Sequence, residues 1–341
     1  MTIAYDDLRR SLASRPRTWL VTGIAGFIGS NLLDELLALG QSVVGLDDFS
    51  TGHQSNLDDV LSAHSDAATR FRMIAGDIRD AHACRDACQS VDFVLHQAAL
   101  GSVPRSVHDP ITSAQVNVDG FLQILVAARD AGVQRVVYAS SSSVYGDSTA
   151  LPQREDETGR PLSPYAATKA CDEMFASVFQ STYGMSVIGL RYFNVFGRRQ
   201  DPNGPYAAVI PRWVSNLLHG DSCSIFGDGE TSRDFCHVAN AVEANILAAL
   251  APAERAGDVY NIACGESTSL NELFRVLRQQ LAASRPDIAS AEPRYEPFRP
   301  GDVRKSLAEI TKARQQLGYE PINRLEAGLS EALPWYVSRF S

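Results

Sequence analysis

The segment SPYAATK, from Ser163 to Lys169, places a phenol and an amine where they could act together. Proline at position 164 favours a helix start near Tyr165, and residues four apart share one face of a helix. Tyr165 and Lys169 would therefore point into the same space, where an ammonium group stabilises a phenolate. A phenol in this state can take a proton from a sugar hydroxyl while a hydride leaves the adjacent carbon. Because Y-x-x-x-K also occurs by chance on helices, one turn of an ordinary helix is the alternative.

A run of four serines, Ser140 to Ser143, ends a hydrophobic segment upstream of this pair. Serine hydroxyls compete with the hydrogen bonding of a strand, so four in succession are unusual there. In a doubly wound sheet the serines would lie at the carboxyl end of a strand, where such folds bind ligands. A hydroxyl at this place could hold the reacting oxygen of a substrate. For any single serine, a polar exit from the strand into a loop is the alternative.

The segment VTGIAGFIGS carries Gly23, Gly26 and Gly29 at three-residue spacing, between a hydrophobic segment and a helix-forming one. This is a variant of the dinucleotide-binding fingerprint, in which glycines allow a tight turn and close approach of the backbone to a pyrophosphate. The helix that follows supplies N–H donors and a partial positive charge. The next segment ends in Asp47, near the distance at which an acid meets the ribose hydroxyls. A carboxylate there repels a 2′-phosphate, so the pattern predicts NAD rather than NADP.

The acidic residues near this motif also have a structural interpretation. Asp47 and Asp48 could simply begin a polar loop after their strand. Asp77 closes the following strand-like segment and could bond the adenine, or it could only cap the next helix.

Strand-like and helix-like segments alternate through the first 195 residues. Segments rich in β-branched residues that end in small or acidic residues occupy 18–23, 42–48, 72–78, 93–99, 135–141 and 186–193. Helix-period segments closed by glycine, such as 30–40 and 111–132, lie between them. Such alternation predicts right-handed βαβ units and a parallel sheet with helices on both faces. The expected fold class is α/β: a Rossmann-type doubly wound parallel sheet with a smaller C-terminal α/β substrate-binding domain.

The regularity weakens after about residue 195, where polar loops and shorter helices begin. A capping box from Ser269 to Glu272 predicts one helix start in this part. We expect an N-terminal extension (1–17), an NAD-binding Rossmann domain (18–195) and a substrate-binding domain (196–341). The boundary is approximate, and segments can cross back over it.

Composition argues against several classes of partner. The net charge of −9 over 341 residues argues against nucleic acid or an anionic membrane as a partner. No segment approaches the about 20 apolar residues of a membrane span, and the N-terminus does not resemble a signal peptide. The six cysteines contain no C-x-x-C and no histidine spacing suited to zinc. We therefore expect free thiols, no metal site and a cytoplasmic location.

From about Thr18 to its C-terminus the chain resembles the extended short-chain dehydrogenase/reductase family, and within it the UDP-hexose 4-epimerases. The motifs that carry the resemblance are VTGIAGFIGS, DDFSTG, GDIRD, HQAA, SSSSVYG, SPYAATK, RYFNVFG, GDGETSRDF and RPGDVRKS. The resemblance implies that Tyr165 acts as base and acid, that Lys169 tunes it and binds ribose, and that Ser141 bonds the sugar oxygen. It also implies a homodimer in which helices at about 112–130 and 165–183 pair as a four-helix bundle. Packing of these helices within a monomer is the alternative.

The remaining ligand contacts are likewise implied by the resemblance. NAD would be held by Gly23, Gly26, Phe27, Ile28, Gly29, Asp47, Asp48, Phe49, Ser50, Thr51, Gly52, Asp77, Ile78, Gln97, Ala98, Ala99, Tyr165 and Lys169. The UDP-sugar would be bound by Gly101, Ser102, Val103, Ser141, Ser142, Ser143, Tyr165, Asn194, Ala208, Val209, Arg233, Arg299, Asp302 and Ser306. Arg233 and Arg299 also make independent physical sense, because a guanidinium forms bidentate, charge-assisted bonds to phosphate. Taken alone, each would be read as a solvated surface charge.

The same family contains 4,6-dehydratases and nucleotide-sugar decarboxylases, which share oxidation at C4. Dehydratases carry an Asp-Glu pair where Ser142 and Ser143 stand here, and decarboxylases typically carry Glu at the position of Ser143. Without those carboxylates the simplest cycle remains: oxidation to a 4-keto sugar, rotation about the link to UDP, and return of the hydride to the opposite face. A UDP-glucose 4-epimerase or a UDP-glucuronate decarboxylase is the alternative. A non-catalytic NAD sensor, from another functional class, would be expected to lack Tyr165 or Lys169.

Ser306 bears on the choice of sugar. In UDP-galactose epimerases this position is commonly a tyrosine that closes the pocket near C2, whereas serine leaves room for an N-acetyl group. The resemblance therefore predicts interconversion of UDP-GlcNAc and UDP-GalNAc, with the uronic acid forms as further substrates and a place in polysaccharide biosynthesis. The alternative is a surface serine with no effect on selectivity.

Overall fold

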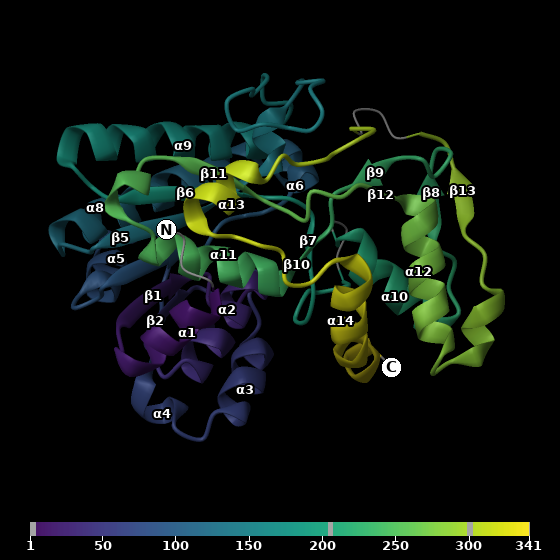
Figure 1. The fold of residues 1–341 in the computed structure, drawn as a ribbon, viewed down its shortest axis with the longest axis horizontal. Helices are drawn as coiled ribbons and strands as arrows, with labels where there is room; N and C mark the ends of the chain where they lie inside the picture. Colours follow the sequence, from purple (N-terminus) through teal and green to yellow (C-terminus); the bar gives the residue numbers. More distant parts are fainter. Residues whose placement is uncertain (1–4, 204–206, 299–302, 341) are drawn as a thin grey trace.

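The computed structural model describes residues 5–203, 207–298 and 303–340, and its centre is a seven-stranded parallel sheet (Figure 1). The strand order is β11-β6-β5-β4-β1-β2-β3. These strands are β1 (Thr18–Thr22), β2 (Ser42–Asp47), β3 (Phe71–Ala75), β4 (Phe93–His96), β5 (Arg135–Ser141), β6 (Val187–Tyr192) and β11 (Val259–Ile262). All six segments expected as strands belong to the sheet. The doubly wound α/β fold is confirmed.

The strand order reverses between β1 and β4, and this reversal determines where ligands can bind. β2 and β3 lie on one side of it, and β5 and β6 lie on the other. Doubly wound folds bind ligands outside the carboxyl ends of the strands at such a point. Thr22 at the end of β1 pairs in register with His96 at the end of β4. The glycine loop after β1 and the segment after β4 therefore leave the sheet side by side.

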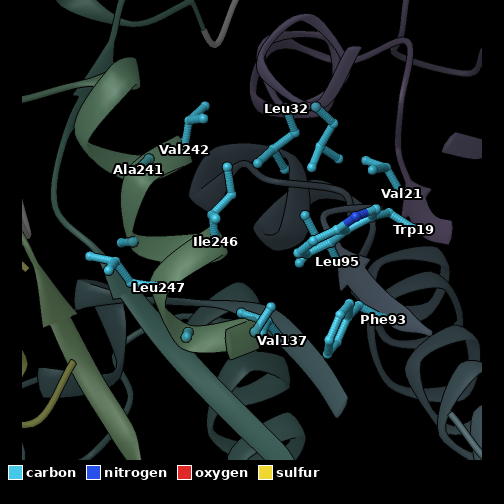
Figure 2. Packing of buried hydrophobic residues seen from close by; sticks show 14 of the residues in the cluster. Trp19, Val21, Leu32, Phe93, Leu95, Val137, Ala241, Val242, Ile246 and Leu247 are labelled. Carbon is cyan, nitrogen blue, oxygen red and sulfur yellow. The ribbon is translucent and has the colours of Figure 1, made fainter. Parts of the chain in front are cut away.

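Helices cover both faces of the sheet. α2 (Phe27–Ala38) and α11 (Val238–Leu250) cover one face, and α5 (Ala81–Cys88), α8 (Gly120–Asp130) and α9 (Pro164–Tyr183) cover the other. Figure 2 shows Val242 and Ile246 of α11 gathered with Leu32 of α2 and with apolar side chains of the sheet. Because both faces are buried, the central strands read as nearly continuous apolar runs.

Shorter elements connect these layers. They are α1 (Tyr5–Ser14), α3 (Gln54–Ala63), α4 (Ala67–Arg70), α6 (Val103–His108), α7 (Pro110–Ala114), the π-helical turn η1 (Gln115–Asp119), the 3₁₀ turns η2 (Ser142–Tyr145), η3 (Ala253–Arg255) and η4 (Pro286–Ser290), and α13 (Thr311–Leu317). The segment 111–132, expected as one helix, contains the π turn in its first half. Such turns often mark functional sites, because they redirect the side chains that they carry.

A second apolar core lies beside the sheet, among α10 (Val209–His219), α12 (Leu270–Ala282) and α14 (Leu325–Phe340) (Figure 1). Three short strand pairs border it: β7 (Val195–Phe196) with β10 (Cys236–His237), β8 (Ser224–Phe226) with β13 (Arg294–Glu296), and β9 (Ser232–Arg233) with β12 (Thr268–Ser269). α12 begins at the expected capping box, where the Glu272 backbone N–H donates to Ser269 Oγ over 3.2 Å.

The chain returns to the large sheet well after residue 196. β11 forms its edge strand, and α11 packs against β4, β5 and β6. The division between residues 195 and 196 stays a prediction, and the two parts of the chain interlock. α1, in the N-terminal extension, buries Leu8 and Leu12 against the main core. None of the helices in the described residues is long and apolar enough to cross a membrane.

Candidate active site

α9 begins where the sequence predicts. Ser163 caps it by accepting a hydrogen bond from the Ala166 backbone N–H (3.1 Å), and Pro164 occupies the first turn. The backbone N–H of Tyr165 donates to Ser106 Oγ of α6 over 2.9 Å, which fixes the first turn against its neighbour. Tyr165 is partly exposed, so its hydroxyl could be reached by a ligand. Lys169, one turn further along, is buried.

Some hydroxyls of the serine run form hydrogen bonds within the protein, and one does not. Ser140 Oγ donates to Glu173 Oε1 over 2.6 Å, and Ser141 Oγ accepts from the Ser143 backbone N–H over 3.1 Å. Ser143 Oγ is buried and has no hydrogen-bond partner within the described residues. Since a buried hydroxyl without a partner is costly, its position suits a hydrogen bond to a bound substrate.

A buried polar network supports the helix of Tyr165 from behind. Arg191 of β6 donates to both carboxylate oxygens of Glu173, each over 2.8 Å, and to the Tyr145 hydroxyl over 3.1 Å. Tyr145 in turn donates to Asn261 Oδ1 of β11 over 2.6 Å. The network joins α9, β6, η2 and β11, so it fixes α9 relative to the serine run.

A pocket of about 320 Å³ lies outside the carboxyl ends of β1, β2 and β4. Its lining comprises Gly23, Gly26, Phe27, Ile28, Gly29, Leu46, Asp47, Asp48, Ser50, Thr51, Gly52, Gly76, Asp77, Ile78, Gln97, Ala98, Ala99, Leu100, Gly101 and Val116. Most residues that the sequence predicts to hold NAD line this cavity, but Tyr165 and Lys169 do not. Phe49 is not in this lining, because its side chain packs against the main core.

The glycines of this pocket are required by close packing. Gly23 has a φ of +66°, and a Cβ added to it would lie 2.7 Å from the Ala98 nitrogen. A Cβ on Gly29 would lie 2.1 Å from the carbonyl oxygen of Gly23. Gly26 caps α2 without a side chain, so the first N–H groups of the helix face the cavity unobstructed. This bare helix start fits the pyrophosphate of a dinucleotide.

Asp47 ties the glycine loop to the next loop. Its Oδ2 accepts from the Ala25 backbone N–H and its Oδ1 from that of Phe49, each over 2.8 Å. Burial raises the pKa of Asp47, and the two backbone bonds oppose this effect. Each oxygen keeps a further lone pair for a ribose hydroxyl. Asp77 instead pairs with Arg79, which holds its pKa below the usual range.

The loop after β4 is held by partners from three elements. Asn117 of the π turn accepts from the Leu100 backbone N–H over 2.8 Å and donates to Thr168 Oγ1 of α9 over 3.0 Å. Tyr192 donates to Gln97 Oε1, whose amide donates to Asn245 of α11 over 3.0 Å. The sequence prediction missed Asn117, although a polar residue inside an apolar helix pattern was a usable signal.

His96 sits beneath the same pocket, fully buried. Its Nδ1 lies 2.8 Å from Thr22 Oγ1, which accepts from the Ala98 backbone N–H over 3.2 Å. Burial, followed by the nearby charge of Lys169, lowers the pKa of His96 to about 3. His96 is therefore neutral at neutral pH, and its tautomer determines which of the two side chains donates in the bond to Thr22.

Acid should destabilise the protein through His96. Its folded pKa of about 3 lies below the unfolded value of about 6.5. The stability it contributes is thus present above pH 6.5 and is lost as the pH falls. Between pH 7 and pH 5 we expect this residue to lower the free energy of unfolding by about 2 kcal/mol. Urea denaturation of the wild type and of His96→Asn, which keeps an acceptor but cannot titrate, measures the difference. Equal slopes against pH in the two proteins would contradict the prediction.

A second, larger pocket of about 660 Å³ lies between β9, α10 and the loop after β6. It is lined by Asn194, Pro202, Asn203, Ala207, Val209, Arg212, Trp213, Ser215, Asn216, Ser224, Phe226, Thr231, Arg233, Phe235 and Leu270. Asn194, Val209 and Arg233 of the predicted substrate set line this pocket. Asn194 has a φ of +32°, and its side-chain amide donates to the Asp234 carbonyl over 3.1 Å.

Other residues of the predicted substrate set have structural roles or lie elsewhere. Ala208 is the residue that precedes α10, and the Ser102 hydroxyl caps α6 by accepting from the Arg105 backbone N–H. Val103 is exposed on α6. Arg299 and Asp302 lie outside the described residues. Within the described residues, no group of three or more histidine, cysteine, aspartate or glutamate side chains could hold a metal ion, and the six cysteines are free.

Asp234, which the sequence prediction missed, joins the second pocket to Ser306. The carboxylate is fully buried and accepts from the backbone N–H groups of Cys264 (2.9 Å), Gly265 (3.0 Å) and Ala308 (3.3 Å). The Ser306 backbone N–H donates to the Ser232 carbonyl, and its hydroxyl donates to Gln153 Oε1 over 3.4 Å. Arg233 and Ser306 therefore belong to segments that one cluster of hydrogen bonds links.

Comparisons with known proteins agree with this geometry. The model of the NAD-dependent epimerase/dehydratase family matches residues 19–263. A UDP-glucose 4-epimerase of Mycolicibacterium smegmatis is 40% identical over 320 residues, which are 93% of this chain and 97% of that protein. A UDP-N-acetylglucosamine 4-epimerase structure from Methanobrevibacter ruminantium aligns with a TM-score of 0.87 at 38% identity, over 95% of this chain and 99% of that one. A UDP-glucuronic acid 4-epimerase structure from Bacillus cereus, solved with UDP-glucuronic acid and NAD, aligns with a TM-score of 0.83 at 28% identity. The alignment covers 94% of this chain and 99% of that one.

Proposed function

Because the chain belongs to the NAD-dependent epimerase/dehydratase family, we propose that it interconverts UDP-GlcNAc and UDP-GalNAc by inverting C4 of the sugar. The cofactor is NAD, and the reaction class is 4-epimerisation of a UDP-sugar. The choice of an N-acetylated sugar is the finer part of the proposal. It rests on one observation, the small Ser306 side chain, which is 8% exposed at the end of the cluster that also holds Arg233.

Separate groups of residues would bind the cofactor, transfer the proton and anchor the substrate. The glycine loop, Asp47 and the segment 97–99 would hold NAD, which when bound supplies a reversible hydride acceptor. Tyr165 would take the proton of the 4-hydroxyl and later return it, with Ser141 bonding the same oxygen. Lys169 would stabilise the phenolate. The second pocket, with Arg233 and Asn194, would anchor the nucleotide diphosphate while the sugar turns.

A UDP-glucose 4-epimerase is the second candidate, and the identity with the mycobacterial protein favours it. A decarboxylase has less support, because the serine run offers no carboxylate. UDP-GlcNAc and UDP-glucose differ in one substituent at C2 of the sugar. The residue nearest that substituent would therefore determine which of the two the protein prefers.

Product analysis tests the function directly. The protein would be incubated separately with UDP-GlcNAc, UDP-glucose and the corresponding uronates, C4 epimers would be resolved by NMR, and protein-bound NAD would be measured on the same sample. We expect UDP-GalNAc from UDP-GlcNAc at a higher rate than UDP-galactose from UDP-glucose, without net NADH. Steady production of NADH would indicate a dehydrogenase, and carbon dioxide from a uronate would indicate a decarboxylase.

A second copy of the chain should cover the outer face of α6, α7 and α9. Large apolar side chains project there, with Val107 64%, Ile111 70%, Met174 62% and Val178 51% exposed. Isolated exposed apolar residues are ordinary, but a cluster on adjacent helices marks an interface. Light scattering should give twice the chain mass of 37.0 kDa. The double variant Met174→Asp/Val178→Asp should be monomeric, whereas Ile322→Asp, at an exposed site in the loop between α13 and α14, should stay dimeric.

A further inference from the structure

Lys169 has a buried partner within its own helix. Its Nζ lies 3.1 Å from Asp172 Oδ2, and the two side chains are 3% and 1% exposed. The second carboxylate oxygen, Asp172 Oδ1, is buried and accepts no hydrogen bond from the described residues. An acid three residues after the lysine is on the same helix face, so the sequence contained the signal without showing its burial.

The packing around this pair does not explain it as a stabilising device. Removing two charges from water costs more than an imperfect ion pair returns, and a packed apolar pair is often as stable. Asp172 is imperfectly satisfied, because one oxygen has no donor. A buried ion pair of this kind, on the helix that carries the proposed base Tyr165, points to an electrostatic role.

Among the described residues, the charged and titratable groups near the Lys169–Asp172 pair come from α9 and from strands of the sheet. Its own helix contributes Lys169 and Glu173, and Glu173 is already paired with Arg191 of β6. β4 contributes His96, which is neutral, and β5 contributes Tyr138, whose pKa burial raises well above the usual value. The charge of Asp172 therefore acts on other groups through its ion pair with Lys169. Burial raises the pKa of Asp172 to about 6, opposed by the charge and hydrogen bond of Lys169, so the carboxyl group is ionised at neutral pH.

We infer that Asp172 is a positioning residue that orients the Lys169 ammonium and offsets its charge, and thereby sets the pH at which Tyr165 becomes a base. This inference rests on the proposed role of Tyr165 in proton transfer. An ammonium carries three N–H donors, and Asp172 takes one, which leaves two directed elsewhere. The negative charge also weakens the stabilisation that Lys169 gives to a phenolate. The enzyme would thus keep Tyr165 protonated to a higher pH than an unpaired lysine would.

Direct titration of Tyr165 tests the inference without any substrate. The protein would be labelled with tyrosine carrying ¹³C at Cζ, and the Tyr165 signal would be identified by its loss in Tyr165→Phe. In Asp172→Asn, which keeps an acceptor for Lys169 but removes the charge, the titration midpoint of Tyr165 should fall by about one pH unit. Asp172→Glu, which keeps the charge, should restore a midpoint near that of the wild type.

Two controls separate this role from a structural one. Asp130→Asn removes the same charge from an exposed pair with Arg129 on α8 and should leave the Tyr165 midpoint unchanged. If Asp172→Asn fails to fold, Asp172→Ala leaves a small cavity instead of an amide and should show the same shift. An unchanged midpoint in either folded variant would overturn the inference.

The same variants connect the inference to turnover. In the pH profile of kcat for epimerisation, the acid limb of Asp172→Asn should move to lower pH together with the titration midpoint of Tyr165. The KM for the UDP-sugar should change little. Absence of epimerase activity in the wild type would refute the proposed function, but the NMR midpoints would still support or overturn the role of Asp172.

Discussion

Replacing Tyr165 with phenylalanine should lower the rate of C4 epimerisation by about 10³-fold, the contribution typical of a positioned general acid–base group. The phenylalanine ring keeps the shape and packing of tyrosine and removes only the hydroxyl. The first turn of α9 is fixed through the backbone N–H of residue 165, which the substitution leaves in place. Turnover should be measured by NMR on UDP-GlcNAc, with protein-bound NAD and UDP affinity measured on the same preparation.

The binding measurements distinguish an enzyme from a sensor. An epimerase should lose turnover in Tyr165→Phe while bound NAD and UDP affinity stay unchanged. A non-catalytic NAD sensor should show no turnover in the wild type and normal binding in both proteins. A variant that retained most of the wild-type rate would contradict the assignment of Tyr165 as the base.

Replacing Ser306 with tyrosine should reverse the preference between N-acetylated and plain sugars. If residue 306 lies near C2 of the bound sugar, as we propose, the larger ring would clash with an N-acetyl group there. We expect the ratio of kcat/KM for UDP-GlcNAc to that for UDP-glucose to fall on the order of 10²-fold, because steric exclusion acts on one substrate only. Kinetics on both substrates, with the wild type measured in parallel, give this ratio.

The neighbourhood of Ser306 calls for a matched control. Its hydroxyl donates to Gln153 Oε1, so the tyrosine could act by displacing Gln153 rather than by contact with the N-acetyl group. Ser306→Ala removes this hydrogen bond without adding bulk and should keep the preference for UDP-GlcNAc. Equal losses on both substrates in Ser306→Tyr would show that this position does not select the sugar.

Local patterns predicted the parts of the site that a single segment builds. The glycine loop and the start of α9 depend on spacing and on capping residues a few positions apart, and each was predicted where it is found. The parallel sheet followed from the period of its segments. These features are readable because the physical constraint acts within about ten residues of chain.

Contacts between distant segments could not be predicted in the same way. Nothing in the segment around His96 indicates its contact with Thr22, which only the sheet creates. Likewise, nothing around Asp234 indicates that three backbone N–H groups from other segments donate to it. Asp172 differs, because its partner Lys169 is only three residues away. The sequence indicates this pairing but not that the pair is buried. β11 is four residues long and far from the other strands in sequence, so its place at the sheet edge depended on packing.

The return of α11 and β11 to the large sheet limits how this protein can be recombined with its relatives. A chimaera that exchanges everything after residue 195 would replace the helix that covers β4, β5 and β6 together with most of the second pocket. Foreign side chains on α11 would then have to fit the packed surface seen in Figure 2. Because the protein is not modular at that boundary, transplanting substrate specificity requires two separate exchanges that leave residues 238–262 native.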